Sequence, residues 1–537
     1  MMRIDGPKRV SAARNVARVV AIALVLVACG GDAGSDDDPA DTAQPETTAS
    51  ESGGGELVVS LPNQPSAIDP VNAPDVVAGN VAWQMFDALA FINEDGEIEP
   101  ALAESWEVSE DGRTYTFTLR QGVTFHNGEP FNADAVVFTW NAGKNPENYY
   151  FDTFELASNV EAIDEFTVAI TTDEPNALFL SQVAASWPMF PPGYYEEVGL
   201  QGFAQAPMGT GAFQFVEWVQ GDRIVLEAFE GYWREGYPKI DRVVFRPIPE
   251  SSTRAAAIRT GDVDIVSRLT PEEAATLEAV DGVEVVTYAN NRVYYIAFNN
   301  LTSGVGQPTE DPLVRQALNH AVDKQSILDA LFAGTGRVPT ALLTPGDVGY
   351  DDAIEAYAYD PDRARELLAE AGYADGFDME MSCPSDAYTN FVEVCEAVAA
   401  QLTEVGVNVS LGVMESGAYW DLQAEKQLPP MFGDSWSANS NEASAYDRLF
   451  GALGGEGASF SAWSDPEIDR LMGDIIVTLD DGERASIFTE IHRRLHEDPP
   501  FIYLYEPETI EAITDRVENY RPRSAEDYWL WAVELAG

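Results

Sequence analysis

The sequence predicts an α/β protein built from two or more lobes, and three observations lead to this prediction. Roughly 480 residues follow an N-terminal stretch that has little to bury, and this is more than one hydrophobic core usually serves. Segments with strand-like alternation are interleaved along the chain with segments of helical periodicity. No repeat with a period of about 20 to 50 residues occurs, which argues against a solenoid or a propeller.

Strand and turn signals dominate the first half of the chain. Residues 57–61 are typical of a short strand, and residues 76–90 carry helical periodicity. Residues 106–119 alternate about Asp111-Gly112, the composition of a tight β-hairpin turn. The apolar face of this hairpin is formed by Tyr115, Phe117 and Leu119. Further elements are expected at 213–219 and 223–229 (a hairpin), at 242–248 (a strand) and directly after Asn132 (a helix).

Helix signals dominate the second half. Asp311-Pro312 supplies an N-cap and a first-turn proline, and the helical spacing that follows is expected to end at Gly334. Asp360-Pro361 repeats this device, with Gly372 as the C-cap. Strands are expected at 377–381 and 501–505, with a helix that begins near Asn390.

The first residues have the layout of an export signal. A basic front precedes an apolar run, Val19 to Ala28, that is too short to span a bilayer as a mature helix. Leu26-Val27-Ala28-Cys29 resembles the lipobox of bacterial lipoproteins, which implies a signal peptide at 1–28 and lipidation of Cys29. An ordinary signal peptide that ends in a chance cysteine is the alternative. Residues 29–56 contain little to bury and are expected to form a flexible acidic tether.

The charge balance is strongly acidic. The chain has 31 Lys and Arg against 90 Asp and Glu, a net charge of −59. Nucleic acid and anionic membrane surfaces are therefore poor partners. Such a surface repels itself at low ionic strength and is tolerated where salt screens it, so we expect a salt-adapted protein. An acidic surface that is indifferent to salt is the alternative.

Few residues suggest catalysis or metal binding. Cys383 and Cys395 form either a disulfide or two buried thiols, and they make a weak metal site. His492 and His496 are four residues apart on an expected helix, where a solvated face is favoured over a metal site. Nucleophile-elbow, phosphate-loop and zinc-protease motifs are absent, and paired carboxylates are the enzymatic alternative left open. We expect no enzyme activity and no cofactor.

A family resemblance extends over nearly all of 57–537. The segment LAESWEVSEDGRTYTFTLRQGVTFHNGEPF at 102–131, followed by ADAVV at 133–137, resembles the signature block of family 5 extracellular solute-binding proteins. These are the dipeptide, oligopeptide and nickel receptors of ABC importers. Further matches follow in the family's order: GTGAF at 209–213, GYW at 231–233, RAAAIRTGDVD at 254–264, YIAFN at 295–299, DPLVRQALNHAVD at 311–323 and YDPDRARELL at 359–368.

The resemblance implies a two-lobed, hinge-bending receptor with the type II periplasmic-binding-protein fold. Lobe I is expected to be discontinuous, comprising 57–292 and 506–537, with an inserted subdomain at about 70–205. Lobe II is expected at 293–505. The hinge is expected near Asn291-Arg292 and Tyr503–Tyr505, and closure buries the ligand in the cleft between the lobes.

The resemblance also indicates ligand-binding residues. The family's cleft segment has a Trp followed by an acidic residue that pairs with the α-ammonium of a peptide. Here Trp436 is present, but Asn439 stands where the acidic residue normally lies. An amide accepts a hydrogen bond from an ammonium group without the charge that strengthens it, so Glu442 or Asp434 is a candidate substitute. Further candidates are Tyr503, with core packing as its alternative, Asn63, and Arg292, whose fork suits a carboxylate.

These features together predict a lipid-anchored, extracytoplasmic solute-binding protein. It is expected to capture a small organic solute, an oligopeptide or a peptide-like compound, by lobe closure and to deliver it to an ABC permease with its ATPase. A monomer is expected, with membrane contact through the lipid anchor alone. The alternatives are a sugar, an amine or a metal complex as ligand, and a role as a ligand sensor for a signalling receptor.

Overall fold

The computed structural model describes residues 54–536 except 74–75, 94–95, 386 and 438–460. The expected signal peptide, Cys29 and most of the tether lie outside the described residues. Within the described ranges, none of the helices has the length and the apolar run needed to cross a bilayer.

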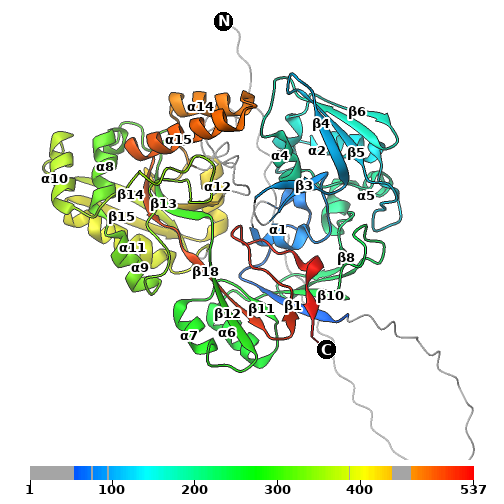
Figure 1. The fold of residues 1–537 in the computed structure, drawn as a ribbon. Coiled ribbons are helices and arrows are strands. Elements are labelled where there is room, and N and C mark those ends of the chain that lie inside the picture. The colour runs from blue at the N-terminus through cyan, green and yellow to red at the C-terminus, as the bar shows by residue number, and fades with distance from the viewer. Residues whose placement is uncertain (1–53, 74–75, 94–95, 386, 438–460, 537) are drawn as a thin grey trace, which may run out of the picture. The chain divides into compact units, whose positions relative to one another are not determined.

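A seven-stranded sheet combines the first half of the chain with a strand from its C-terminal end (Figure 1). The first strand is parallel to both of its neighbours, and the C-terminal strand β18 inserts antiparallel between two earlier strands. Helices α6 (Ser251–Thr260) and α7 (Pro271–Leu277) pack on this sheet. The strand order is β12 (Val283–Ala289), β18 (Glu508–Thr514), β11 (Ile265–Val266), β1 (Glu56–Leu61), β10 (Arg242–Pro247), β9 (Arg223–Ala228) and β8 (Phe213–Val219).

A separate four-stranded antiparallel sheet is formed by residues between β1 and β8. It contains the expected hairpin, and the predicted apolar face is confirmed because Tyr115, Phe117 and Leu119 are buried. The strand order is β4 (Ala103–Val108), β5 (Thr114–Leu119), β7 (Thr167–Thr171) and β6 (Asn159–Asp164). The other elements of this region are α1 (Val76–Ala82), β2 (Ala90–Ile92), β3 (Ile98–Pro100), α2 (Ala133–Gly143), α3 (Phe151–Glu155), α4 (Phe179–Ser186) and α5 (Pro192–Gln205).

A five-stranded sheet is the centre of the second half (Figure 1). Strand β14 is parallel to both neighbours, whereas β13 is antiparallel to both of its own. The order is β15 (Val407–Met414), β14 (Phe377–Pro384), β16 (Met431–Ser437), β13 (Arg292–Phe298) and β17 (Phe501–Tyr505). The helices are α8 (Pro312–Ala321), α9 (Lys324–Leu331), α10 (Pro361–Glu370), α11 (Phe391–Glu404), α12 (Ser416–Ala424), α14 (Pro466–Val477) and α15 (Asp481–Glu497).

Short elements complete the described chain. A two-stranded sheet near the C-terminus pairs β19 (Val517–Glu518) with β20 (Glu534–Leu535). Three single-turn 3₁₀ helices lie at Pro70–Asn72, Pro308–Glu310 and Leu530–Ala532.

The predicted N-caps Asp311 and Asp360 are confirmed, whereas the C-cap of α10 is Ala371, directly before the predicted Gly372, and two helix lengths were wrong. Asp311 and Asp360 each accept a hydrogen bond from the first turn of the following helix. Two helices replace the single helix that was expected to end at Gly334. The first ends because Val322 is extended, and Asp323 caps the second by accepting a hydrogen bond from the Ser326 N–H. The helix expected at 76–90 ends at Ala82.

Tertiary hydrogen bonds explain the early end of α1. The backbone carbonyls of Gln84 and Met85 accept hydrogen bonds from the N–H groups of Phe213 and Gly211, at 3.1 and 3.0 Å. These carbonyls therefore pair with the start of β8 rather than continue the helix.

The chain crosses between the two large sheets twice. One crossing is Asn290-Asn291, between β12 and β13, and the other is Glu506-Pro507, between β17 and β18. The second crossing is held by Arg337, which exchanges two backbone hydrogen bonds with Glu506 and pairs with its carboxylate. Burial raises the pKa of Glu506 to about 7, and Arg337 opposes that shift.

Cys383 and Cys395 form a disulfide, which decides between the two alternatives that the sequence left open. The bridge joins the end of β14 to α11, and both cysteines are fully buried. The connection between these elements contains Tyr388 and Thr389.

Candidate functional site

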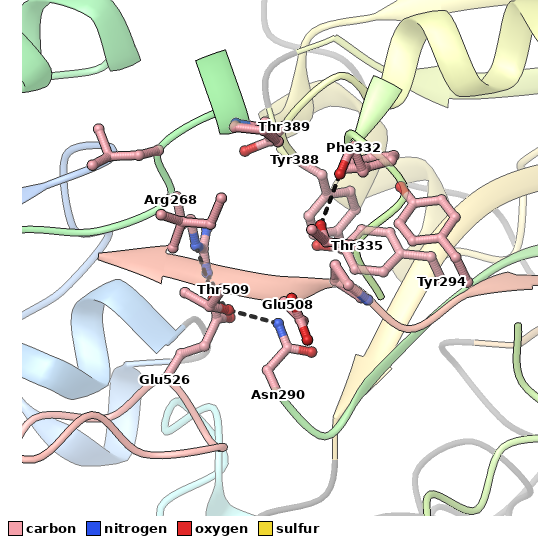
Figure 2. A pocket seen from close by; sticks show the side chains of 15 residues that line it. Arg268, Asn290, Tyr294, Phe332, Thr335, Tyr388, Thr389, Glu508, Thr509 and Glu526 are labelled. Atoms are coloured by element: carbon pink, nitrogen blue, oxygen red, sulfur yellow. Dashed lines mark hydrogen bonds and ion pairs between the residues drawn. The ribbon is translucent and has the colours of Figure 1, made fainter. Parts of the chain in front are cut away.

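A pocket with an empty volume of about 550 Å³, part of it open to solvent, lies where the chain crosses between the two large sheets (Figure 2). The crossing segments and the strand ends beside them supply Asn290, Tyr294, Tyr505, Pro507, Glu508 and Thr509. Elements of the seven-stranded sheet and its surroundings add Arg268, Leu269, Pro271, Ile510 and Glu526. Elements around the five-stranded sheet add Phe332, Thr335, Tyr388 and Thr389.

An ion pair forms one side of the pocket. Arg268 donates from Nη2 to Oε2 of Glu526 at 3.1 Å and from Nε to Oε1 at 3.4 Å. Nε of Arg292 lies 3.5 Å from the same Oε2, so one carboxylate faces two guanidinium groups. Burial opposes ionisation of Glu526, but the two arginines hold its pKa below the usual value. The carboxylate is therefore ionised at neutral pH.

Two neutral side chains extend this polar side. Asn290 Nδ2 donates to Oγ1 of Thr509 at 2.8 Å, and that hydroxyl donates to Oε1 of Glu526 at 3.2 Å. Asn290 belongs to one crossing, Thr509 lies two residues after the other, and both are almost fully buried. The hydrogen-bond chain thus links the two crossings to the ion pair.

Aromatic rings form the opposite side of the pocket (Figure 2). Tyr294 and Tyr505 stack with ring centroids 4.8 Å apart and planes 10° apart. Tyr388 meets Tyr294 edge to face at 5.1 Å, and Phe332 packs against Tyr505 at 4.8 Å. The hydroxyl of Tyr505 is buried, and no hydrogen-bond partner for it exists in the described part of the chain. A buried hydroxyl without a partner needs an explanation, and in a pocket wall a bound water or solute group can supply one.

Asp434, a candidate substitute for the missing acid, supports this aromatic side. It is 3% exposed and accepts hydrogen bonds from the Tyr388 hydroxyl at 2.8 Å and from the Ser435 N–H at 2.7 Å, with Gln423 as a third donor. Burial raises the pKa of Asp434 to about 6 against the effect of these donors. Asp434 therefore orients Tyr388 and does not line the pocket.

The other sequence-predicted residues within the described ranges lie beside the pocket or away from it. Arg292 reaches Glu526 and donates from Nη1 to Oγ of Ser435 at 3.0 Å. Asn63 is exposed, and its Nδ2 donates to the Gln64 carbonyl at 3.3 Å. Tyr503 lies in the core instead of the cleft, fully buried, with its hydroxyl bound to the Leu495 carbonyl at 2.8 Å.

Trp436 lies at the end of β16, opposite Val293 of β13, and is half-buried against the core of the five-stranded sheet. Asn439 and Glu442 lie outside the described residues. The structure therefore places Trp436 in the sheet that carries the aromatic side of the pocket, without placing the rest of its segment.

Sequence reasoning missed the residues that define the pocket, above all Arg268, Glu526 and Tyr388. It did single out the strand 501–505, but period-2 alternation puts Tyr503 and Tyr505 on the same face. A register shift between Tyr294 and Tyr295 breaks this alternation. Tyr505 therefore pairs with Tyr294 and stacks on it in the pocket wall, whereas Tyr503 pairs with Tyr295. No local pattern in the sequence marks such an irregularity.

The described residues contain no group of three or more His, Cys, Asp or Glu that could hold a metal ion. The prediction that His492 lies on a solvated face of α15 was wrong. His492 is fully buried, and its Nε2 lies 3.0 Å from the Thr340 hydroxyl. Burial lowers the pKa of His492 to about 4. The two histidines thus pack the helix against the Thr340 segment, since Nδ1 of His496 lies 2.9 Å from the Thr340 carbonyl.

Comparison with known proteins identifies relatives over most of the chain. Residues 97–457 match the model of the bacterial extracellular solute-binding proteins, family 5, middle part. The glutathione-binding protein GsiB of Pectobacterium atrosepticum is 31% identical over 479 residues, which cover 87% of this chain and 91% of GsiB.

Solved structures of similar fold cover 90% of this chain. DppA, an ABC transporter-associated periplasmic binding protein of Helicobacter pylori in complex with the peptide STSA, has a TM-score of 0.81 at 26% identity, with 98% of its chain covered. AgaA of A. tumefaciens R10, in complex with agropinic acid, has a TM-score of 0.80 at 25% identity, with 99% of its chain covered. The fold is therefore that of the type II periplasmic binding proteins, as the sequence predicted.

Proposed function

This chain belongs to family 5 of the bacterial extracellular solute-binding proteins, and we propose that it captures a small organic solute, an oligopeptide or peptide-like compound, for an ABC importer. Its relatives are binding proteins that serve transport rather than enzymes. One observation carries the proposal: a single pocket takes lining residues from both large sheets and from both crossings between them.

The proposed mechanism is reversible capture by closure of two lobes. Each large sheet is the centre of one lobe, with 57–292 and 506–537 in one and 293–505 in the other, and the two crossings form the hinge. Because Asn290 and Pro507 belong both to a crossing and to the pocket lining, rotation at the hinge changes the pocket. A solute that contacts both sides favours the closed form, which then docks on the permease. No covalent step is involved.

The chemistry of the pocket favours a peptide-like solute. Aromatic rings offer apolar and stacking surface, while Asn290, Thr509 and the ion pair offer hydrogen bonds and charge. A peptide presents matching groups, namely side chains, amides and charged ends. The likeness to proteins whose names state glutathione and peptide binding supports this class, and the likeness to AgaA makes an opine-like acid the second candidate.

Further contacts are proposed for the residues that the family resemblance indicates. Trp436, Asn439 and Glu442 are proposed to contact the solute as well. Arg292 acts on the solute through Glu526, whose carboxylate it faces. Replacement of Trp436 by Ala is expected to weaken solute binding, and unchanged affinity would remove Trp436 from the site.

We also propose that Cys29 carries the lipid that holds the protein at the outer face of the cell membrane. A binding protein that is tethered to the membrane stays at high effective concentration near its permease. Replacement of Cys29 by Ser is expected to release the protein from the membrane fraction. Retention of C29S in that fraction would contradict the lipid anchor.

A tryptophan-fluorescence titration in molar salt, with peptides, glutathione, agropinic acid, sugars and metal ions, tests the function. Saturable binding of peptides or opine-like acids supports it, and saturable binding of metal ions or sugars alone overturns it. A blocking variant tests the pocket. Thr389 lines the pocket and is half-buried, so Thr389→Trp is expected to abolish binding by filling it. Thr403 is exposed at the far end of α11, and T403W is the matched control that keeps affinity.

A further inference from the structure

The ion pair in the pocket is built on strained backbone. Arg268 has φ 55° and Glu526 has φ 58°, the left-handed region that non-glycine residues rarely adopt. Such residues are strained and persist only where their surroundings hold them, most often at functional sites. Two more non-glycine residues with positive φ, Ala333 and Asn390, adjoin the lining residues Phe332 and Thr389. Four of the seven non-glycine residues with positive φ in the described chain thus line this pocket or adjoin its lining.

Buried side chains hold both strained residues in place. Arg254 is 3% exposed and donates to the backbone carbonyl of Arg268 at 2.9 Å and to that of Ser267 at 3.1 Å. Asn80 is also buried, and its Nδ2 donates to the Glu526 carbonyl at 2.9 Å. The surroundings thus fix the two backbones that present the charged groups, which is preorganisation of a site rather than a chance ion pair.

The geometry leaves part of the Arg268 guanidinium free for a ligand. Nε and Nη2 are directed to Glu526, whereas Nη1 has no hydrogen-bond partner among the described residues. The side chain is 22% exposed and lines the pocket as well as a second, smaller hollow whose empty volume of about 250 Å³ includes open solvent. Two guanidiniums share one carboxylate, so Arg268, Arg292 and Glu526 together carry one positive charge, while Glu508 adds a second carboxylate to the lining of the pocket.

Resting on the proposed function, we propose that Arg268 binds a carboxylate of the captured solute, so that the transported compounds are peptide-like molecules with a free carboxylate. Nη1 donates to the carboxylate of the solute while Glu526 keeps the other two nitrogens and orients the guanidinium plane. The aromatic side of the pocket packs against the rest of the solute. Arg268 is thereby the residue that distinguishes a free acid from its neutral derivative.

A pair of peptide mixtures tests this assignment. The mature protein is incubated in about 1 M KCl with tetrapeptides of mixed sequence that end in a free carboxylate, or with the same tetrapeptides as C-terminal amides, and capture is measured by native mass spectrometry and titration. The acidic surface attracts the more cationic amides over a long range. Molar salt screens this attraction and leaves direct contacts between Arg268 and the peptide in place. A charge-assisted hydrogen bond predicts at least about tenfold tighter binding of the acids.

Variants assign the preference to Arg268. Arg268→Gln is expected to bring the ratio of acid to amide affinity close to one, and R268K to restore part of it. In R268Q the Glu526 carboxylate has lost one of the two positive charges that face it. The double variant R268Q/E526Q removes this carboxylate as well and is also expected to lose the preference for acids. Arg242 of β10 is 45% exposed and pairs with Glu56 of β1. The variant R242Q is the control, in which the ratio stays at the value of the natural protein.

The outcomes separate the two proposals. Equal capture of acids and amides, or a preference that survives in R268Q/E526Q, overturns the carboxylate assignment while the binding of peptides still stands. Capture of neither mixture overturns this inference, and the proposed function falls with it if glutathione and agropinic acid also fail to bind.

Discussion

The disulfide between Cys383 and Cys395 should contribute about 3 kcal/mol to the free energy of unfolding. The two cysteines are 12 residues apart, and closing a loop of that size in the unfolded chain removes conformational entropy worth roughly this amount. The bridge ties α11 to the end of β14, a strand of the five-stranded sheet. Its loss should therefore destabilise the region that carries Tyr388 and Thr389.

Urea unfolding of the oxidised protein, the reduced protein and the variant C383A/C395A measures this contribution. Both sulfurs are fully buried, so reduction is carried out in the unfolded state and the thiols are counted by mass spectrometry. The reduced natural chain keeps both side chains, and its lower midpoint isolates the crosslink from packing. The alanine variant should be less stable still, because it also loses buried sulfur contacts. Coincident midpoints for the oxidised protein and the fully reduced protein would refute the reasoning.

Three further predictions concern charge and packing. Burial raises the pKa of Glu511 to about 7 from its ordinary 4.5, so its contribution to stability is fully present below about pH 4.5 and is lost as the pH rises through 7. The free energy of unfolding of E511Q should therefore equal that of the natural protein near pH 4 and exceed it by up to about 3 kcal/mol at pH 8. Urea titrations at both pH values measure this difference, and equal stability at pH 8 would contradict a buried neutral carboxyl group. Gly433→Ala should cost about 1–3 kcal/mol, because the new Cβ would lie 2.9 Å from Phe391 Cε1 and 3.2 Å from Cys395 Sγ. Gly473→Ala, which meets nothing within 4 Å on α14, is the control and should be neutral or stabilising, and equal losses in the two variants would reject the packing argument. The melting temperature should rise between dilute and molar KCl, since screening weakens the repulsion among 90 acidic residues, and a temperature independent of salt would favour the salt-indifferent alternative.

Local signals in the sequence predicted many elements of the fold. Asp111-Gly112 marked the turn of the β4–β5 hairpin, and Asp311 and Asp360 marked helix starts, because caps and tight turns are satisfied by atoms within a few residues. The prediction failed where distant segments compete for the backbone. The first helix ends at Ala82 since the next carbonyls pair with the start of β8, far along the chain.

The candidate site was less predictable than the fold for the same reason. Arg292 and the strand 501–505 were found because they adjoin the expected crossings, and Arg292 does reach the charged side of the pocket. Tyr503 and Tyr505 were not separable, since only the irregular register of β13 and β17 directs one into the core and the other into the pocket wall. Whether Cys383 and Cys395 are bridged also depended on the packing of α11 against β14.

The sequence by itself determined the family, the α/β class and the type II fold, since ordered motifs and local caps survive in the linear pattern of residues. Only the tertiary structure decided which side chains meet at the pocket. Arg268 and Glu526 are 258 residues apart, and each is directed to the other by a strained backbone that buried Arg254 and Asn80 hold in place. Such a pairing is a product of long-range packing, because no local preference of an arginine or a glutamate favours that conformation.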